Sequence, residues 1–595
     1  MKLLHDLYHT VKRGGIPRLF ASWLLVLTYH ALRYRSRLGT VTFAEELSLF
    51  TFAMAVAACY LLLSLLAIAT ANTAADRRIL GTCALLYASV VAYTARDLTT
   101  GLGVCLVLGL ILWYLFSHSG KTTELSPKLT IPLTAVVALA FALFTASFTV
   151  LLYLTFRSPS FDLGVFSHMF YNMKEHLLPL TTVERDGLLS HFAVHISPVY
   201  YLILPFYCLF PSPITLQIVQ AVILASGVIP VYLLSRKLNF SHQSTLFWCC
   251  AYCFYPALAG GCNFDLHENC FLAPFLLWLF YFAESRKTVP MYLFAILTLS
   301  VKEDAAVYVA FLALFLLISK KQYRHGSALL VLSIGCFMVE SLILSQYGHG
   351  VMNYRYDAYF SGNGSMVTVL FNLLKDPSTV FRHILANDRW EFILLMLVPL
   401  LGLPFLFGRK PARIILVGPF LLVNLMPQYV YQYSIYFQYA FGSLAFLFYA
   451  AMLTVSDRKL SAKRALPALC AAFALMLFFS SVLEKGEIVK DYQKNRDTYE
   501  TLASYLSEIP DDASVKASTF LLPHLADRDE IYGMDTKHTV DWVVIDLRYP
   551  SMEDAKITDE ALQKDPAFEC VAREEGMITL YRRTNTSQSP DSAPS

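Results

Sequence analysis

Long apolar runs joined by short polar links restrict the fold of this chain more than any other feature. Between residues 17 and 482, about fifteen runs approach the roughly 20 apolar residues that a helix needs to cross a bilayer. Only 15% of the residues are charged and 56% are hydrophobic, whereas a soluble globular protein is about 25% charged. The sequence therefore predicts an all-α polytopic membrane protein with about 13–15 transmembrane helices.

The links between the runs predict the orientation, because Lys and Arg gather in short cytoplasmic loops. With the N-terminus in the cytoplasm, seven basic loops fall on the cytoplasmic side: 75–78, 117–128, 235–243, 284–287, 319–325, 408–413 and 456–464. Only RYRSR (33–37) falls on the other side, so the segment 17–34 could lie in the membrane interface instead. FPSP directly follows the apolar segment 196–210, which we therefore interpret as re-entrant or interfacial.

The same pattern divides the chain into regions. We expect N-terminal transmembrane helices over 1–128, a transmembrane core over 129–484 with outer loops 157–195 and 346–390, a small α/β domain over 485–583, and a disordered tail over 584–595. Short strand-like stretches such as TVDWVVIDLRYP predict the α/β domain, and the basic loops place it outside. A single long helix over 289–319 would reverse the sidedness downstream of it.

Nucleic acid is not an expected partner. The net charge is only +3, and the sequence has no basic patch interleaved with aromatic residues. Membrane lipids are the expected surroundings of the chain.

Three polar stretches at the ends of apolar runs fall on the expected outer side. They are SPSFDLGVFSHMFYN (158–172) with Asp162, NFDLHEN (263–269) with Asp265, His267 and Glu268, and SVKEDAAVY (300–308) with Lys302, Glu303 and Asp304. A charged group in hydrocarbon is costly, so such residues lie at membrane edges or in wet cavities and commonly mark functional sites. On a helix Asp265 and Glu268 would share a face. Asp162 and Asp265 could instead each cap a helix, as Asp often does.

Two cationic side chains lie among these stretches or in the outer loops. Lys302 could contact a phosphate as a point charge, or only neutralise Glu303 and Asp304. Arg355 lies in MNYRYDAYFSGNG (352–364), where the aromatic residues suit sugar stacking or phosphate contact. An interfacial aromatic belt would explain the same composition.

A pair of histidines forms a weaker candidate site. His191 and His195 are four residues apart, so on a helix they would share one face. This spacing could hold a divalent metal, although an isolated pair is weak evidence for a metal site.

The order of these motifs resembles a known family. FDLGVFSHMFYN, SHFAVHISPVYYLILPFYCLFPSP, IPVYLLSRKL, FYPALAGGCNFDLHENCFLAPFLLWLFYF and LTLSVKEDAAVY are similar to the bacterial membrane proteins grouped as domain of unknown function 2079. The resemblance covers roughly residues 150–450, and the C-terminal region resembles the extension found in that family. It implies a multi-pass protein of the bacterial cytoplasmic membrane, for which the basic loops predict a cytoplasmic N-terminus and an extracytoplasmic C-terminal domain.

A more distant resemblance, to the GT-C fold glycosyltransferases, suggests an activity. Those enzymes carry an essential Asp in an outer loop, a second acidic site and a Lys-Gly-Pro-like motif, which Asp162, Asp265 and Lys302 match. Glu303 and Asp304 replace the Gly-Pro, and the histidines also depart from the pattern. The resemblance implies a GT-C-like core that moves a sugar from a polyprenyl-phosphate-linked donor to an envelope glycan, lipid or protein at the outer face.

Within this hypothesis each candidate residue has an expected role. Asp162 is the general base, with Asp265 as a second catalytic carboxylate. Lys302, Arg355 or a divalent metal would lie near the donor phosphate, and the remaining acidic candidates, Glu268, Glu303 and Asp304, would bind substrate. His191 and His195 are the candidate metal ligands, although donors of this kind can react without metal.

Two other functions remain open at this stage. A transporter or flippase would need charges deep in several spans and an inverted repeat with broken helices, whereas the charges found here lie at the ends of spans. A non-catalytic membrane assembly or sensor protein would use the C-terminal domain to bind a partner. Convergence of Asp162, Asp265 and Glu303 or Asp304 on one cavity would favour the enzyme.

Overall fold

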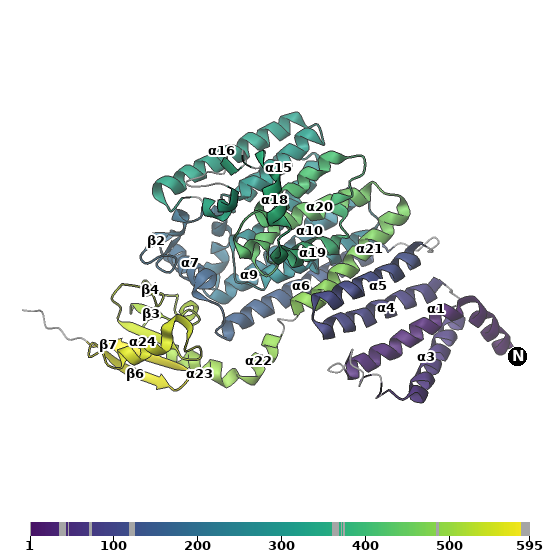
Figure 1. Cartoon of the computed structure of the whole chain (residues 1–595), viewed down its shortest axis with the longest axis horizontal. Coiled ribbons are helices and arrows are strands. Elements are labelled where there is room, and N and C mark those ends of the chain that lie inside the picture. Colours follow the sequence, from purple (N-terminus) through teal and green to yellow (C-terminus); the bar gives the residue numbers. More distant parts are fainter. Residues whose placement is uncertain are drawn as a thin grey trace, which may run out of the picture.

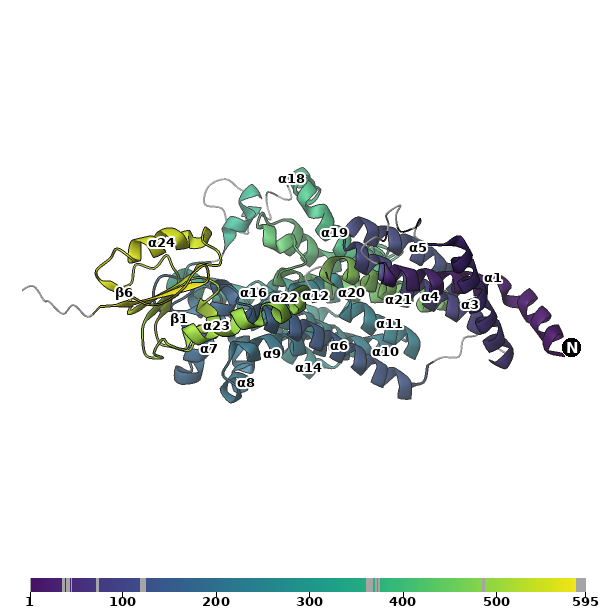
Figure 2. The same cartoon turned by 90° about the horizontal axis from the view of Figure 1, so that it is seen from below.

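The computed structural model describes residues 2–34, 47–70, 74–117, 125–350, 352–359, 375–483 and 487–584, with isolated positions at 38, 43, 45, 368, 369 and 372. The helices form an elongated bundle. The strands gather in a small domain at one end, and the N-terminal helices lie at the other (Figures 1 and 2). Of the expected tail over 584–595, only Thr584 is among the described residues.

Four N-terminal helices form one side of the bundle: α1 (Lys2–Arg33), α3 (Leu49–Thr70), α4 (Ala74–Ala95) and α5 (Leu98–Ser117). α1 packs against α3 and α4, and α5 packs against α21 (Leu460–Leu477) of the core. A buried ion pair joins Arg18 of α1 to Asp76 of α4, with the side-chain N and O atoms 2.9 Å apart. The two charges thus partner each other inside an apolar bundle, where an isolated charge would be costly.

Helix α20 (Phe441–Ser456) is buried along nearly its whole length and packs against α12 (Pro256–Cys262), α13 (Leu272–Ser285), α15 (Ala305–Ile318) and α21. Besides these helices, the core contains α6 (Pro127–Leu154), α9 (Pro213–Ser226), α10 (Val228–Lys237), α11 (His242–Cys253), α14 (Thr288–Leu299), α16 (Tyr323–Tyr347) and α19 (Trp390–Leu397). Glycines allow close packing here, since a Cβ on Gly418 would lie 1.8 Å from the Phe311 ring.

Fewer helices than expected are long enough to cross a membrane alone. Among the described residues eight qualify by length and composition, or nine if α11 and α12, bent by 41°, form one span. Polar residues 300–304 separate α14 from α15, so 289–319 is not one helix. One of the apolar runs of the sequence, residues 413–428, is not a continuous helix but consists largely of short 3-10 and π turns, η10 (Pro411–Val417) and η11 (Phe420–Leu425). In the segment 196–210, α8 (Leu204–Leu209) is only six residues long.

The C-terminal region forms the expected small α/β domain. Its sheet has the order β4-β3-β5-β7-β6, with β3 parallel to both β4 and β5, and β7 antiparallel to β5 and β6. The strands are β3 (Val515–Ala517), β4 (Ile531–Tyr532), β5 (Trp542–Asp546), β6 (Phe568–Glu574) and β7 (Ile578–Arg583), and the helices are α22 (Ile488–Lys494), α23 (Arg496–Leu506) and α24 (Ala555–Leu562). Leu502 of α23 packs on Val544 and Leu580 of the sheet.

Two long loops lie at the domain end of the bundle. The first contains η2 (Ser160–Gly164), α7 (Val165–His176), a hairpin of β1 (Leu180–Thr181) and β2 (Leu189–Ser190), and η3 (His191–Ala193). The second, expected over 346–390, is described only in part and includes η6 (Asn353–Tyr359) and α18 (Pro377–Ile384). The first loop contacts the C-terminal domain through a hydrogen bond from the Thr182 hydroxyl to the Ile531 carbonyl, and the second contacts the first through a bond from the His349 N–H to the Ala193 carbonyl.

Candidate active site

Asp162 has an unusual backbone conformation. Its φ of 68° and ψ of −85° lie near the γ-turn geometry that is rare and strained. Such conformations cost about 1–3 kcal/mol and persist only where the surroundings enforce them, often at functional sites. Asp162 does not cap a helix, because η2 begins after Pro159 and Gly164 precedes α7.

The C-terminal domain contacts the chain before and after Asp162. Thr519 accepts a hydrogen bond of 3.1 Å from the backbone N–H of Ser160, and Leu522 lies against Gly164. The ring of His524 stacks on Phe156, with 3.8 Å between centroids. Residues more than 350 positions apart therefore fix the conformation around Asp162.

Gly164 packs closely against the C-terminal domain. A Cβ there would lie 2.7 Å from Cδ2 of the buried Leu522, so Gly164→Ala should destabilise the protein by about 1–3 kcal/mol through overpacking. Thermal unfolding in detergent would measure the loss. Gly103→Ala in α5 is the matched control, because nothing lies within 4 Å of its Cβ position. Equal melting temperatures for the two variants would contradict the packing argument.

Asp265 lies next to the first loop. Its carboxylate accepts a hydrogen bond of 2.8 Å from the Ser158 hydroxyl and another from the Gln217 side-chain amide. Burial raises the pKa of Asp265 to about 7, and the negative charge of Asp162 acts in the same direction. The tripeptide Phe-Asp-Leu occurs at 161–163 and again at 264–266, and its two aspartates are therefore neighbours in space. Asp265 does not cap a helix either, since η5 (Glu268–Phe271) begins after His267.

Glu268 is the centre of a buried polar cluster. Its two carboxylate oxygens lie 3.0 Å from Lys302 Nζ and 3.0 Å from His267 Nδ1, and the Tyr200 hydroxyl donates to it at 2.5 Å. Burial alone would raise the pKa of Glu268, but His267 and Lys302 hold it well below its usual range. Glu268 is thus an ionised carboxylate that orients Lys302.

The two candidate metal ligands each bind a different carboxylate. His191 Nδ1 lies 2.8 Å from Glu184 and His195 Nδ1 lies 2.9 Å from Glu303, while the histidine ring centroids are 6.0 Å apart. Burial would lower the pKa of His191, but the Glu184 charge raises it overall. Within the described part of the chain, no three His, Cys, Asp or Glu side chains are placed to hold a metal ion, so we derive no step through a metal.

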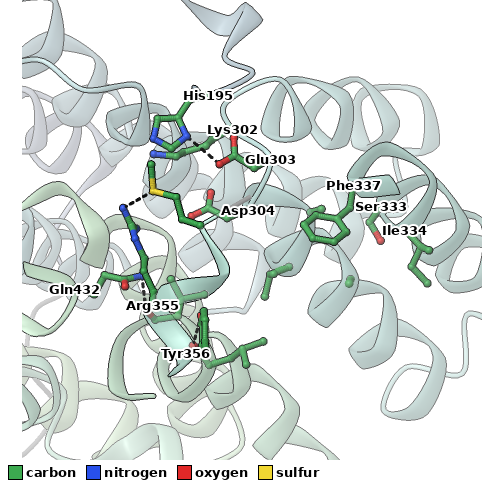
Figure 3. Close-up of a pocket in the computed structure, with 16 residues that line it drawn as sticks. His195, Lys302, Glu303, Asp304, Ser333, Ile334, Phe337, Arg355, Tyr356 and Gln432 are labelled. Carbon is green, nitrogen blue, oxygen red and sulfur yellow. Dashed lines mark hydrogen bonds and ion pairs between the residues drawn. The ribbon is translucent and has the colours of Figure 1, made fainter. Parts of the chain in front are cut away.

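A cavity of about 280 Å³ opens beside this cluster. Figure 3 shows His195, Lys302, Glu303, Asp304 and Arg355 gathered in one part of its wall. The rest of the wall comes largely from apolar side chains of α15 and α16, including Ala306, Val307, Ala310, Ile334 and Phe337. The cavity therefore joins a charged end to an apolar groove.

Two tyrosine rings lie close to the Arg355 guanidinium. Its guanidinium lies 4.6 Å from the Tyr429 ring centroid and 5.4 Å from that of Tyr439, within the range of cation–π attraction. Arg355 Nη2 contacts the Met352 sulfur at 3.0 Å. No described carboxylate lies within ion-pair distance of Arg355, although the negative charge of Asp304 acts on it. The tyrosines thus hold a cation at the cavity rather than forming only an interfacial belt.

The structure brings only some of the sequence candidates to this cavity. Lys302, Glu303, Asp304 and Arg355 line it, whereas Asp162, Asp265 and Glu268 do not. The charges of Glu268, Lys302 and His191 all act on Asp162, whose pKa rises to about 7, first through burial and then through Glu268. Asp304 and Arg355 complete the charged end of the cavity. Sequence reasoning missed three buried partners, Glu184, Tyr200 and Gln217. Tyr200 and Gln217 lie in apolar segments, and Glu184 lies in VERDG (183–187), whose composition is that of an ordinary charged loop.

Comparison with known proteins identifies the family. Residues 152–579 match the family described as "Predicted membrane protein (DUF2079)". This chain belongs to the DUF2079 family. The match extends beyond the resemblance over 150–450 and takes in most of the C-terminal domain. No curated protein matches the chain in sequence.

Solved structures show the fold of this DUF2079 protein. The crystal structure of ArnT from Cupriavidus metallidurans bound to undecaprenyl phosphate aligns with a TM-score of 0.50 and 12% identity, over 78% of this chain and 100% of that chain. Its apo structure gives a TM-score of 0.49 and 11% identity, over 78% and 99%. The first alignment confirms the predicted GT-C-like architecture with a small C-terminal sheet.

Proposed function

We infer that this protein is a membrane glycosyltransferase that takes its sugar from a polyprenyl-phosphate-linked donor. The observation that carries the inference is the cavity, in which Lys302 and Arg355 line the same space as the apolar side chains of α15 and α16. A lipid-linked phosphate needs both a cation and an apolar groove. The ArnT structure with undecaprenyl phosphate supports the proposal through its fold.

The two cations have different roles in this proposal. Lys302 is already paired with Glu268 and supplies a fixed positive charge near the donor phosphate. Arg355 contacts the Met352 sulfur and forms no ion pair with a described carboxylate, so its guanidinium can form paired hydrogen bonds to phosphate oxygens. Asp304, next to Lys302, lies on the same wall and can accept hydrogen bonds from sugar hydroxyls.

Asp162 is the base in the proposed reaction. Its carboxylate accepts the proton of the acceptor hydroxyl while that oxygen forms a bond to the anomeric carbon of the sugar. The bond between that carbon and the phosphate oxygen breaks, and its electron pair leaves with the polyprenyl phosphate. A base of this kind contributes about 10²–10⁴-fold to rate. Asp265, bonded to Ser158 and Gln217, helps to position the loop beside it.

The rate should depend on pH near neutrality. The pKa of Asp162 is raised from its usual range to about 7, so lowering the pH through 7 protonates the base and removes activity. We expect kcat/KM to fall about tenfold per pH unit below pH 7 and to level off above about pH 8. Initial rates in proteoliposomes from pH 5 to pH 9 would measure this. A flat profile across that range would contradict the assignment of Asp162 as base.

The same proposal places the protein in the membrane. Basic loops 408–413 and 456–464 lie at the end of the bundle away from the C-terminal domain, and basic loops favour the cytoplasm. The candidate site and the C-terminal domain would then face the outer side of the bacterial cytoplasmic membrane, where the acceptor is an envelope glycan, lipid or protein.

Filling the groove tests the proposal. Ala310 of α15 lines the cavity, so Ala310→Trp should weaken binding of polyprenyl phosphate at least tenfold by occupying the space of the lipid chain. Val331→Trp on α16 is the control, because Val331 is 72% exposed and does not line the cavity. Binding can be measured with radiolabelled polyprenyl phosphate on purified protein. Equal affinity for polyprenyl phosphate in the two variants would contradict the proposal that the lipid chain occupies the groove.

A further inference from the structure

A second charged cavity lies at the opposite end of the bundle from the candidate active site. It has a volume of about 480 Å³ and is formed by residues 406–413 and by the C-terminal end of α20. Four basic side chains line it, Arg409, Lys410, Arg413 and Arg458, together with one carboxylate, Asp457. The site therefore carries a clear excess of positive charge.

Part of this cluster is rigidly held. Arg413 is only 5% exposed, donates to the Leu453 carbonyl at 3.1 Å and contacts Asp457 at 2.7 Å. Asp457 also binds Lys410 at 2.8 Å, and Arg458 donates to the Leu406 carbonyl at 2.9 Å. One carboxylate is thus shared by two cations and cannot neutralise the remaining charge.

Loop orientation and helix capping explain only some of these residues. Basic residues favour a cytoplasmic loop, and Arg413 satisfies a carbonyl at the end of α20 as a C-terminal cation does. Neither effect requires a cavity with Arg409 and Lys410 exposed on its wall. Basic pockets between membrane helices are suited to anionic lipid head groups.

Apolar side chains border the basic cavity. Leu406, which lines it, is 52% exposed, and the nearby Ile414 and Leu460 are 44% and 62% exposed. We propose that this cavity binds a phosphate group, with the head group of an anionic phospholipid as the ligand that also uses the apolar border. This inference is independent of the proposed glycosyltransferase activity, because the site shares no residue with the first cavity.

The test uses the purified full-length protein in a neutral detergent. Thermal midpoints and binding affinities are compared after addition of phosphatidylglycerol, phosphatidylcholine or inorganic phosphate. The variant Arg409→Gln/Lys410→Gln removes two cations from the cavity. Lys321→Gln/Arg324→Gln is the control, because it removes the same charge from two exposed residues outside the cavity, Lys321 just before α16 and Arg324 in its first turn.

Phosphatidylglycerol should raise the midpoint of the wild type and of the control, and phosphatidylcholine should not. The cavity variant should bind phosphatidylglycerol about tenfold or more weakly, since each basic residue near an anionic lipid contributes measurably. Inorganic phosphate could also raise the thermal midpoint of the wild type. If the cavity variant lost that rise, the result would support a phosphate site whose ligand is soluble. If Arg409→Gln/Lys410→Gln unfolds, Arg409→Gln alone takes its place. A cavity variant that responds like the control, or a wild type that responds to neither anion, would overturn the proposal.

Discussion

Replacing Asp162 with Asn should lower sugar transfer from a polyprenyl-phosphate donor by about 10²–10⁴-fold, the usual contribution of a general base. The amide keeps the size of the side chain but cannot accept the acceptor proton. KM for the donor should change little, because the donor phosphate is proposed to contact Lys302 and Arg355 instead. Initial rates and donor binding on purified protein in proteoliposomes would separate these two effects.

The control for this variant is Glu175→Gln. Glu175 is an exposed carboxylate of α7 that contacts only the neighbouring Lys174 in the ion pairs formed by described residues, so neutralising it should leave the rate unchanged. If Asp162→Asn and Glu175→Gln both retained the wild-type kcat, Asp162 would have no part in the chemistry.

Removing Lys302 should have the largest effect on stability. Lys302→Met leaves the buried Glu268 without the cation 3.0 Å away, and breaking a buried ion pair from one side costs about 3–5 kcal/mol. The double variant Glu268→Gln/Lys302→Met removes both charges and should recover most of the loss. Thermal or denaturant unfolding of the wild type, the single variants Lys302→Met and Glu268→Gln, and the double variant in one detergent would give the coupling energy.

An exposed ion pair gives the comparison for that cycle. Lys490 lies 3.6 Å from Glu487, and both side chains are more than 60% exposed, so Lys490→Met should cost less than about 1 kcal/mol. If Lys302→Met were equally mild, Glu268 would not depend on Lys302 for its charge.

Local sequence patterns predicted much of the fold. Apolar runs predicted the helices, and short strand-like stretches predicted the C-terminal α/β domain. The number of full spans was harder to predict, because α14 and α15 have only 12 and 14 residues and the segment near 413–428 forms short turns. An apolar run shows burial, but it does not show whether a helix continues or breaks.

The candidate site, too, could be predicted from the sequence only in part. Asp162, Glu268 and Lys302 are recognisable because charges interrupt apolar sequence, and the structure places them within electrostatic reach of one another. The strained backbone of Asp162 is not recognisable, because Thr519 and Leu522, which support the turn, come from a different domain. Tyr200 resembles any other aromatic residue of an apolar segment until its bond to Glu268 is seen.

A cryo-EM structure of the protein with bound polyprenyl phosphate would test the central claim most directly. We predict density for the phosphate within hydrogen-bond distance of the Arg355 guanidinium and close to Lys302 Nζ. The lipid chain should follow the groove between α15 and α16, past Ala310. A phosphate bound away from both cations, or a chain lying outside that groove, would contradict the proposed donor site.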